Sequence, residues 1–292
     1  MAGMRAGALA SALGQALVLA APQALAEKAP HALVEKRPQA PAEKGPPLPW
    51  QVLEPGLDTV EIPGPPSGAS DGQITVVRID PARVELKLLA ASAPGQGENR
   101  SARAWAYRAG ASAAINAAMY QEDHRTSVSL MRTGDHVNQR RISKDNAVLA
   151  FDPIVSGVPP VRIVDRECES LDEAAARYRT LVQSIRMISC DGRNVWAPSE
   201  RRFSAAAIGT DRAGRILFIH ARTPWPVHDL VHALQAAPLG LAQAMYVEGG
   251  PEAQLFARGG GKEIERLGTF ESAGENGRAW PVPNVVAAIR KK

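Results

Sequence analysis

The sequence predicts a single α+β domain built on a mixed, mostly antiparallel sheet with a few packed helices, preceded by a signal peptide and a disordered linker. Short segments of alternating β-branched residues outnumber segments with helical spacing. These segments do not alternate regularly, as they would in a doubly wound parallel sheet. A content of 45% hydrophobic and 22% charged residues is ordinary for a globular domain and supplies enough apolar surface for one core.

Residues 1–26 are typical of a signal peptide. Arg5 supplies the positive charge, residues 6–21 are small and apolar, and Ala24-Leu25-Ala26 matches a small-residue cleavage site. The apolar run is too short and too rich in alanine to favour an uncleaved membrane anchor. We therefore expect a secreted or periplasmic protein with no stable membrane span after cleavage.

Residues 27–49 form a linker in which the phrase Glu-Lys-x-Pro recurs every eight residues, beginning at Glu27, Glu35 and Glu43. Dense proline removes backbone donors, and the residues between the prolines offer little apolar surface to bury. This composition predicts an extended, disordered spacer. The folded domain is expected to span residues 50–290.

The domain is predicted to open with a β-hairpin. Residues 73–80 and 83–90 alternate in polarity, are rich in β-branched side chains and are separated by Pro81, a turn former. A second hairpin is expected where two short strands flank the turn Asp211-Arg212-Ala213-Gly214. The strands of that hairpin are residues 205–208 and 216–219, and the further apolar runs are residues 113–119, 147–151, 245–248 and 281–289.

Two segments have helical spacing. Residues 171–184 carry Asp172 and Glu173 in the first turn, where carboxylates complement the helix dipole. Residues 227–237 form the second segment, which ends before Pro238. Few helices among many strands is the balance expected of an α+β domain.

The charge distribution argues against a dedicated nucleic-acid-binding protein. The formal net charge is +4, from 34 lysines and arginines and 30 acidic residues that are spread along the chain. A nucleic-acid binder would gather its basic residues into a stripe. The slight positive excess favours anionic substrates such as phosphate esters.

The cysteines and histidines do not predict a metal site. Cys168 and Cys190 are compatible with a disulfide or with two buried thiols, and their spacing is unlike that of zinc ligands. His228 and His232 are one helical turn apart, but Asp229 follows the first histidine and no HExxH motif is present. We predict no cofactor, although carboxylates beside a phosphate would also suit a divalent cation.

The most informative segment is residues 244–256, AMYVEGGPEAQLF. A buried strand ends in Glu248, and Gly249 and Gly250 allow positive φ and close approach of backbone N–H groups to an anion. Pro251 then permits a new turn or a helix start. This arrangement suits a sugar phosphate, whereas a tight turn with a solvated glutamate is the simpler interpretation of Glu-Gly-Gly alone.

Two further segments supply candidate site residues. In residues 115–123, INAAMYQED, an apolar strand carries Asn116, whose amide both donates to and accepts from a sugar hydroxyl, and Asp123 lies in the acidic loop that follows. In residues 201–222, Arg202 precedes a strand of small residues, where a guanidinium would hold phosphate oxygens. Taken alone, each residue is more often a turn, loop or strand end.

These segments, in this order, resemble the phosphodiester glycosidase family, in its bacterial-type branch. The resemblance runs from Ile74 to Ile289 and rests on six motifs, which together are specific although each alone is weak. The motifs are INAAMY, NAVLAFDP, VQSIRMISCDGRNVW, AAIGTDRAGRILFI, YVEGGPEAQLF and WPVPNVVA. Alanines at positions 117 and 118 replace a glycine common in the family, and Glu248 stands where aspartate is frequent, which keeps the carboxylate and lengthens its reach by one methylene.

The resemblance implies a hydrolase that cleaves the glycosidic bond of a sugar-1-phosphodiester or a related envelope glycoconjugate. Because a phosphodiester leaves as a stable anion, fixed positive charge matters more than a strong acid, and Arg186 and Arg202 fit that role. Glu248 would stabilise the oxocarbenium-like sugar, attack it or activate water, while Asn116 orients the sugar.

The second carboxylate and the class of function have alternatives. The second carboxylate would come from Asp123, Asp191 or Glu252, although Asp191-Gly192 is also typical of a hairpin turn. The alternative to an enzyme is a noncatalytic glycan-binding or wall-binding module on the same fold, because fold does not fix function. Glu248, Asn116 and Arg202 together favour the enzyme.

Overall fold

The computed structural model describes residues 46–65, 72–269 and 278–291. The predicted signal peptide lies outside these residues, as does the predicted linker up to residue 45, so both stay predictions. The first strand begins at Gln51. No helix of the described part is both long and apolar enough to cross a membrane.

The described strands form two sheets, and every pair of named strands is antiparallel. The larger sheet has the order β1-β2-β3-β12-β11-β13-β10-β6-β7, with β8 paired to β10 and β9 paired to β8. Its strands are β1 (Gln51–Glu54), β2 (Leu57–Pro63), β3 (Gln73–Ile79), β6 (Met131–Thr133), β7 (His136–Gln139), β8 (Ala147–Pro153), β9 (Val161–Asp165), β10 (Tyr178–Ile188), β11 (Phe203–Asp211), β12 (Ile216–Trp225) and β13 (Leu241–Gly249).

The smaller sheet has the order β15-β14-β5-β16-β4. Its strands are β4 (Val84–Ala90), β5 (Ala113–Asn116), β14 (Gln254–Gly259), β15 (Lys262–Leu267) and β16 (Asn284–Arg290). Three α-helices accompany the sheets, α1 (Ala102–Ala109), α2 (Leu171–Arg177) and α3 (Val227–Ala236), and one short 3₁₀ helix, η1 (Gly250–Glu252), connects β13 to β14.

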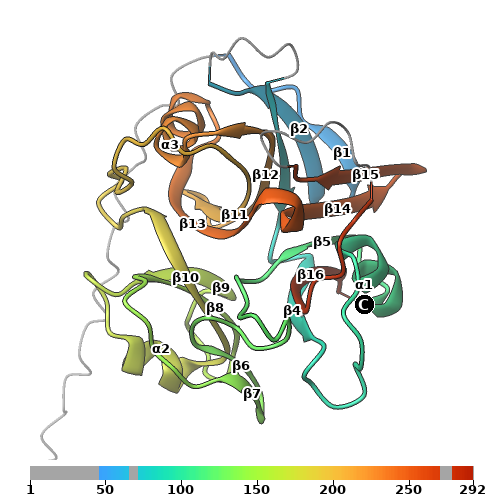
Figure 1. Cartoon of the computed structure of the whole chain (residues 1–292), viewed down its shortest axis with the longest axis vertical. Helices are drawn as coiled ribbons and strands as arrows, with labels where there is room; N and C mark the ends of the chain where they lie inside the picture. The colour runs from blue at the N-terminus through green and yellow to red at the C-terminus, as the bar shows by residue number, and fades with distance from the viewer. Residues whose placement is uncertain (1–45, 66–71, 270–277, 292) are drawn as a thin grey trace, which may run out of the picture. The chain divides into compact units, whose positions relative to one another are not determined.

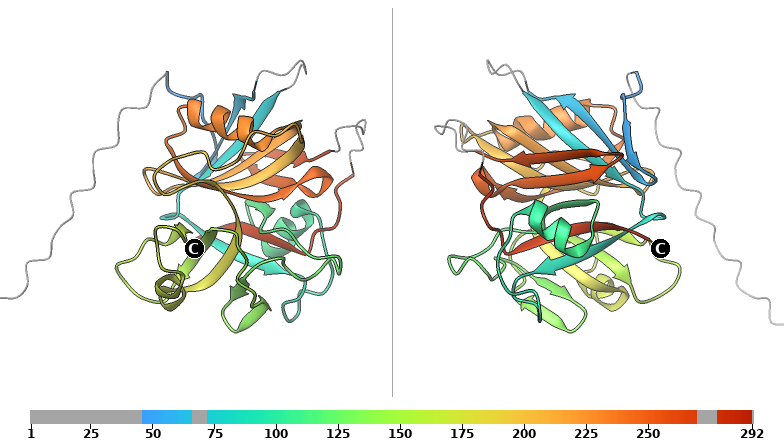
Figure 2. Two further views of the ribbon diagram at one scale, coloured as in Figure 1. Left: turned by 60° about the vertical axis from the view of Figure 1, so that its left-hand side comes forward. Right: turned by 90° about the vertical axis from the view of Figure 1, so that its right-hand side faces the viewer.

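The main hydrophobic core joins the two sheets. Side chains of the larger sheet, such as Phe218 and Met245, belong to the same buried cluster as Ile115, Leu255 and Val286 of the smaller sheet. Because strand side chains alternate between faces, each sheet also has an outer face to cover. α3 packs on the larger sheet beside β11, β12 and β13, and α1 packs on the smaller sheet beside β5 and β16 (Figures 1 and 2).

The predicted opening hairpin is wrong. Both of its strands exist, as β3 and β4, but β3 pairs with β2 and β12 in the larger sheet while β4 pairs with β16 in the smaller sheet. The turn after β3 is closed by Asp80, whose backbone carbonyl accepts from the N–H groups of Arg83 and Val84. Both edges of β3 are already occupied, so the turn carries the chain to the second sheet.

The predicted helix over residues 171–184 is only half right. Ser170 caps α2 through its side chain, which accepts from the Glu173 backbone N–H, but the helix ends at Arg177. From Tyr178 the chain continues as β10, which pairs with β6, β8 and β13. Pairing with strands distant in sequence overrides the local helical spacing.

Other predicted elements are confirmed. The hairpin of β11 and β12 forms across the turn at residues 212–215, and Asp211 accepts there from three backbone and side-chain donors. The second helix is α3, with its predicted boundaries to within one residue. Strands β13 and β16 cover the apolar runs near residues 245 and 285. Helix α1 and strands β1, β2, β6, β7, β9, β14 and β15 are elements that the sequence did not predict.

Candidate active site

The candidate site lies where the chain passes from the larger sheet to the smaller one. β13 ends at Gly249, η1 spans the next three residues and β14 begins at Gln254 (Figure 1). Asn116, the last residue of β5, joins this connection from the neighbouring strand. Residues from two of the six family-like motifs, INAAMY and YVEGGPEAQLF, therefore meet at one place.

A β-bulge sets the position of Glu248. In the pairing of β11 with β13, Ala207 faces Tyr246 while its neighbour Ala206 faces Glu248, so Val247 is an extra residue in β13. Bulges of this kind occur next to active sites, where they re-aim a side chain. Val247 stays in the main core, and Glu248 follows it at the end of the paired region.

Glu248 is a carboxyl group with a strongly raised pKa. Desolvation by the surrounding protein raises its pKa to about 8, and the negative charge of nearby Glu252 adds to the rise. One hydrogen bond opposes both effects, because the Gly249 backbone N–H donates to Glu248 Oε1 over 3.0 Å. At neutral pH the side chain is therefore mainly a neutral carboxylic acid.

Two tyrosines share the site with these carboxylates. Burial raises the pKa of Tyr246 and of Tyr120, and the negative charges of Glu248 and Glu252 raise both further. Tyr246 packs against Trp196, with ring centroids 5.5 Å apart. Both tyrosines belong to family-like motifs, INAAMY and YVEGG, but sequence analysis did not select them, because an aromatic residue in a strand is more often part of the core.

The two glycines have different functions in the backbone. Gly249 is extended, with φ of −140°, and a Cβ there would lie 1.7 Å from the Tyr246 hydroxyl, so glycine is needed for close approach. Gly250 has φ of +62°. The expectation of positive φ thus holds for Gly250 and is wrong for Gly249, whose N–H is directed to Glu248. Pro251 is the second residue of η1, in the first turn where proline is tolerated, so the helix start expected near Pro251 is present.

Asn116 is buried and its amide is bound to the backbone on both sides of the connection. Its Nδ2 donates to the Glu252 carbonyl over 2.9 Å, and its Oδ1 accepts from the Gln254 N–H over 2.7 Å. Asn116 therefore fixes the position of Glu252. Its predicted contact with a sugar stays a prediction.

Two buried side chains near this connection have polar atoms without a partner in the described part of the chain. His220 of β12 is fully buried, its Nε2 lies 3.2 Å from the Ala253 carbonyl, and its Nδ1 has no partner. Burial lowers the pKa of His220 to about 4, so the ring is neutral at physiological pH. The Asn284 Oδ1 accepts from the Ala118 N–H, while its Nδ2 has no partner. Neither residue was predicted for the site.

Arg202 lies at the same end of the larger sheet as the candidate site. It is exposed and directly precedes β11. Ala205 of β11 pairs with Gly249, which places the start of β11 beside the end of β13. This position is consistent with the predicted contact between the Arg202 guanidinium and a phosphate.

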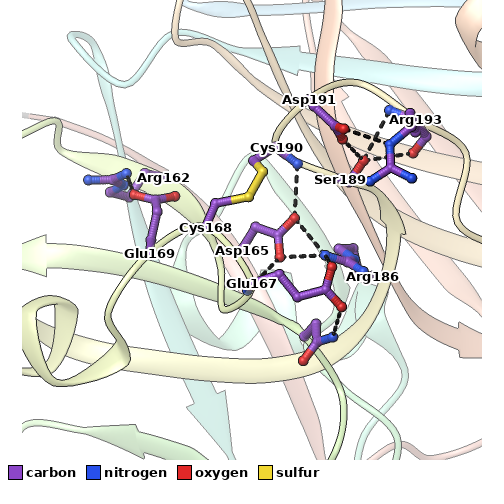
Figure 3. Close-up of a disulfide and its surroundings, with 11 residues drawn as sticks. Arg162, Asp165, Glu167, Cys168, Glu169, Arg186, Ser189, Cys190, Asp191 and Arg193 are labelled. Carbon is purple, nitrogen blue, oxygen red and sulfur yellow. Dashed lines mark hydrogen bonds and ion pairs between the residues drawn. A yellow bond between two sulfur atoms is a disulfide. The ribbon is translucent and has the colours of Figure 1, made fainter.

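Arg186 is held in a different arrangement, shown in Figure 3. The Arg186 Nη1 donates to both carboxylate oxygens of buried Asp165, over 2.6 and 2.8 Å. The same nitrogen lies 2.8 Å from Glu167 Oε2. The Arg186 side chain is only 11% exposed. The structure thus pairs Arg186 with two carboxylates next to the disulfide, and its predicted phosphate contact stays a prediction.

The other two candidate carboxylates, Asp123 and Asp191, accept hydrogen bonds from residues of their own loops. Asp123 accepts from the backbone N–H groups of Arg125 and Thr126 and from the Thr126 hydroxyl, and these hydrogen bonds lower its pKa. Asp191 binds Ser189 and Arg193, which lower its pKa to about 2 (Figure 3). Among the three predicted partners for Glu248, only Glu252 acts on its charge.

Cys168 and Cys190 form a disulfide between the segment after β9 and the turn after β10 (Figure 3). The Cys190 backbone N–H donates to Asp165 Oδ2 over 2.9 Å, which ties the disulfide to the Arg186 ion pair. Asp165 and the two cysteines lie close enough to suggest metal ligands. The sulfurs are bonded to each other, however, and so are not available as thiolates.

One family model matches more than half of this chain. The family described as phosphodiester glycosidase matches residues 109–289. The structure is similar to the catalytic domain of zebrafish N-acetylglucosamine-1-phosphodiester alpha-N-acetylglucosaminidase auto-inhibited by its pro-peptide, with a TM-score of 0.62, 11% identity and 87% of each chain covered. No curated protein matches the sequence.

A hypothetical protein from Synechocystis is also similar, with a TM-score of 0.58 and 15% identity. The alignment covers 85% of this chain and 64% of the Synechocystis protein, which is less than two thirds of its length. At these identities the likeness to both solved structures concerns the fold.

Proposed function

The chain belongs to the phosphodiester glycosidase family, and from this membership we propose that it hydrolyses the bond between a sugar and a phosphodiester leaving group. The observation that carries the proposal is Glu248, a desolvated carboxyl group with a pKa of about 8 beside Glu252. A pair of carboxyl groups, one of them with a raised pKa, is typical of glycoside hydrolysis.

A neutral Glu248 suits an anionic substrate. An ionised carboxylate would repel the phosphodiester, whereas a carboxylic acid donates a hydrogen bond to a phosphate oxygen. Donation along the breaking bond places the proton on the departing oxygen, although such a leaving group needs less protonation than an alcohol. Glu248 is therefore proposed as hydrogen-bond donor and general acid, rather than as the nucleophile.

Glu252 is proposed to stabilise the sugar side of the reaction. When the bond from the anomeric carbon to oxygen breaks, both electrons leave with the phosphate and positive charge develops on the sugar. The Glu252 carboxylate stabilises that charge, water adds to the anomeric carbon, and the carboxylate takes a proton from the water. Asn116 positions Glu252 by a hydrogen bond from its side-chain amide to the Glu252 backbone carbonyl. Arg202 is proposed to bind the phosphate.

The reaction is proposed to take place outside the cytoplasm. The signal peptide predicted over residues 1–26 and the disulfide of Cys168 with Cys190 both support an oxidising compartment. The substrate would then be a sugar-phosphate glycoconjugate of the envelope or of the extracellular medium.

Incubation of the purified protein with a panel of sugar-1-phosphodiesters, including UDP-linked sugars and aryl phosphodiesters, tests the proposal. We expect release of free sugar from at least one compound, lost in Glu248→Gln and retained in Glu85→Gln, a half-buried glutamate on β4 that pairs with Lys87. Binding of these compounds without release of sugar would indicate the noncatalytic glycan-binding module instead. Equal turnover by Glu248→Gln and the parent protein would remove Glu248 from the mechanism.

A further inference from the structure

Helix α3 carries two histidines on a side that the core does not use. Its buried residues are Val227, Leu230, Val231 and Leu234, which pack on the larger sheet. His228 and His232 are one turn apart, and their side chains are partly buried and exposed respectively. Nothing in the proposed glycosidase mechanism uses them.

The two imidazole rings converge on one point. The Nε2 atoms of His228 and His232 lie 3.2 Å apart, and the ring planes cross at 76° with centroids 4.5 Å apart. Two nitrogens bound to one tetrahedral zinc ion, with Zn–N bonds of about 2.0–2.1 Å, are separated by about 3.3 Å. The spacing therefore matches a chelating pair without movement of the helix.

Asp229 sets the tautomer that this chelation requires. Its Oδ1 lies 3.1 Å from His228 Nδ1, so the carboxylate accepts the Nδ1 proton and leaves the Nε2 lone pair available. A carboxylate behind a ligating histidine is the usual support of a metal-bound imidazole. Asp229, which argued against a metal site when only the sequence motif was considered, supports one in the structure.

Hydrogen bonds to a neighbouring turn hold the helix in place. The Asn194 side chain donates to the His228 carbonyl over 3.0 Å, and the Gln235 side chain donates to the Gly192 carbonyl over 2.8 Å. Cys190, in the same segment, is bonded to Cys168, so the disulfide holds this segment in place. A site held on a rigid element loses less entropy when it binds its ligand.

The site opens onto an apolar cavity of about 650 Å³. Asp229 and His232 lie at its wall, and the rest is mainly apolar, formed by residues that include Leu48, Ile62, Pro63, Ala233 and Pro238. Two protein nitrogens leave coordination positions for water or for a ligand from the cavity, as in open metal sites.

We propose that His228 and His232 bind one divalent transition-metal ion, with zinc as the natural candidate, in a site separate from the proposed glycosidase centre. The ion takes the place of the hydrogen bond between the two Nε2 atoms, and the proton of His232 moves from Nε2 to Nδ1 of the same ring. Imidazole nitrogens favour zinc, nickel and copper, whereas magnesium and calcium prefer oxygen ligands. Because binding requires neutral imidazoles, protonation of either ring competes with the metal, so binding weakens in acid.

Isothermal titration of the untagged, metal-stripped protein with zinc sulfate, nickel sulfate and magnesium sulfate tests this site. We expect one saturable zinc or nickel site per chain and no saturable magnesium binding. His228→Gln and His232→Gln should each abolish it, while His124→Asn, a change at an exposed histidine with φ of +52°, should retain it. Asp229→Asn should weaken zinc binding by about 10- to 100-fold.

Circular dichroism checks that the glutamine variants keep the fold. The proposal is overturned if the parent protein shows no saturable zinc or nickel binding, or if either glutamine variant binds as the parent does. Release of sugar by the same variants separates the two proposals, since loss of the metal should leave that activity unchanged. A glycosidase that binds no metal here, or a metal-binding protein without glycosidase activity, would each contradict one proposal only.

Discussion

Glu248 is subject to opposing electrostatic effects, and burial is the strongest of them. Desolvation and the charge of Glu252 favour the neutral acid, while the hydrogen bond from the Gly249 N–H favours the carboxylate. The result is a carboxyl group whose charge changes near pH 8 rather than near its ordinary value. A substrate anion placed beside it would favour the neutral form still more, because like charges repel.

The pH dependence of activity follows from that protonation. If Glu248 must be neutral to bind and protonate the phosphate, kcat/KM should fall as the pH rises through about 8. Glu248→Gln keeps a hydrogen-bond donor but has no proton to transfer, so it should retain much of the KM and lose most of the kcat. Initial rates from pH 5 to 10 measure both effects, and a kcat/KM that rises through pH 8 would contradict the acid role.

The same shift predicts a change in stability. The folded-state pKa of Glu248 is raised from 4.5 to about 8, so the stability due to the bound proton is complete below pH 4.5 and is lost as the pH rises towards 8. Glu248→Gln does not titrate, and above pH 8 it should exceed the parent by on the order of a few kcal/mol. Urea unfolding of both proteins at pH 4.5 and pH 8.5 measures the difference, which should be smaller at the lower pH.

Arg202 is predicted to act on the leaving group rather than on the sugar. Removal of a charge-assisted hydrogen bond to phosphate should lower kcat/KM by about 10- to 100-fold for a phosphodiester substrate in Arg202→Ala. Cleavage of a nitrophenyl glycoside, which has no phosphate, should change little if it occurs. Arg201→Ala, a change at the exposed neighbour, is the matched control. Equal losses on both substrates would argue against a phosphate contact.

At the level of elements, the connection η1 owes its position to β5. Asn116 is bonded to both the Glu252 carbonyl and the Gln254 N–H, and His220 of β12 approaches the Ala253 carbonyl between them. One strand from each sheet thus fixes the segment that carries Glu252. The short 3₁₀ helix is held by these side chains more than by its own hydrogen bonding.

Asn116→Ala tests the positioning of Glu252. Two backbone groups would lose their partners, so the free energy of unfolding should fall by about 2 to 4 kcal/mol. If Glu252 also moves away from Glu248, the pKa of Glu248 should fall, and the alkaline limb of the rate profile should move to lower pH. An unchanged limb with a raised KM would indicate that Asn116 instead binds the sugar directly. Asn138→Ala, which removes hydrogen bonds in another loop, serves as the control.

The elements show why some of the fold was predictable and some was not. The β11–β12 hairpin and α3 depend on neighbouring residues, such as the Asp211 turn and the apolar spacing before Pro238, and both were predicted. β4 pairs with β16, nearly two hundred residues later in the chain, so its separation from β3 leaves no local signal. The helical spacing of residues 171–184 extends into the first part of β10, whose strand partners lie far away in sequence.

For the candidate site too, residues close together in sequence were predictable, whereas contacts between distant elements were not. Glu248, Gly250 and Glu252 follow one another closely, so the motif YVEGGPE places them together. The raised pKa of Glu248 depends on burial by several elements, and no single motif contains that information. Arg186 stands in a motif of the family, yet its partner Asp165 lies on another strand, and only the fold reveals their ion pair.

At the scale of the whole molecule, the disulfide links segments that flank α2 and β10. Cys168 follows β9, Cys190 follows β10, and the turn after β10 supports the start of α3 through Asn194. The ion pair of Arg186 with Asp165 lies beside the disulfide (Figure 3). The Cys190 backbone N–H donates a hydrogen bond to the Asp165 carboxylate. This cluster therefore connects the β8–β10 part of the larger sheet to the helix that carries the two histidines.

Loss of the disulfide should weaken the protein as a whole and loosen α3 in particular. A bridge across 22 residues restricts the unfolded chain, so the double variant Cys168→Ser with Cys190→Ser should lower the free energy of unfolding by about 3 kcal/mol. Urea unfolding measures that change, and intact-mass analysis with and without reductant should show the gain of a pair of hydrogen atoms in the parent only. Because the Cys190 turn holds His228 through Asn194, zinc binding should weaken in the double variant, while the proposed release of sugar from sugar phosphodiesters should be retained. A double variant as stable as the parent would show that the bridge closes no loop that matters to folding.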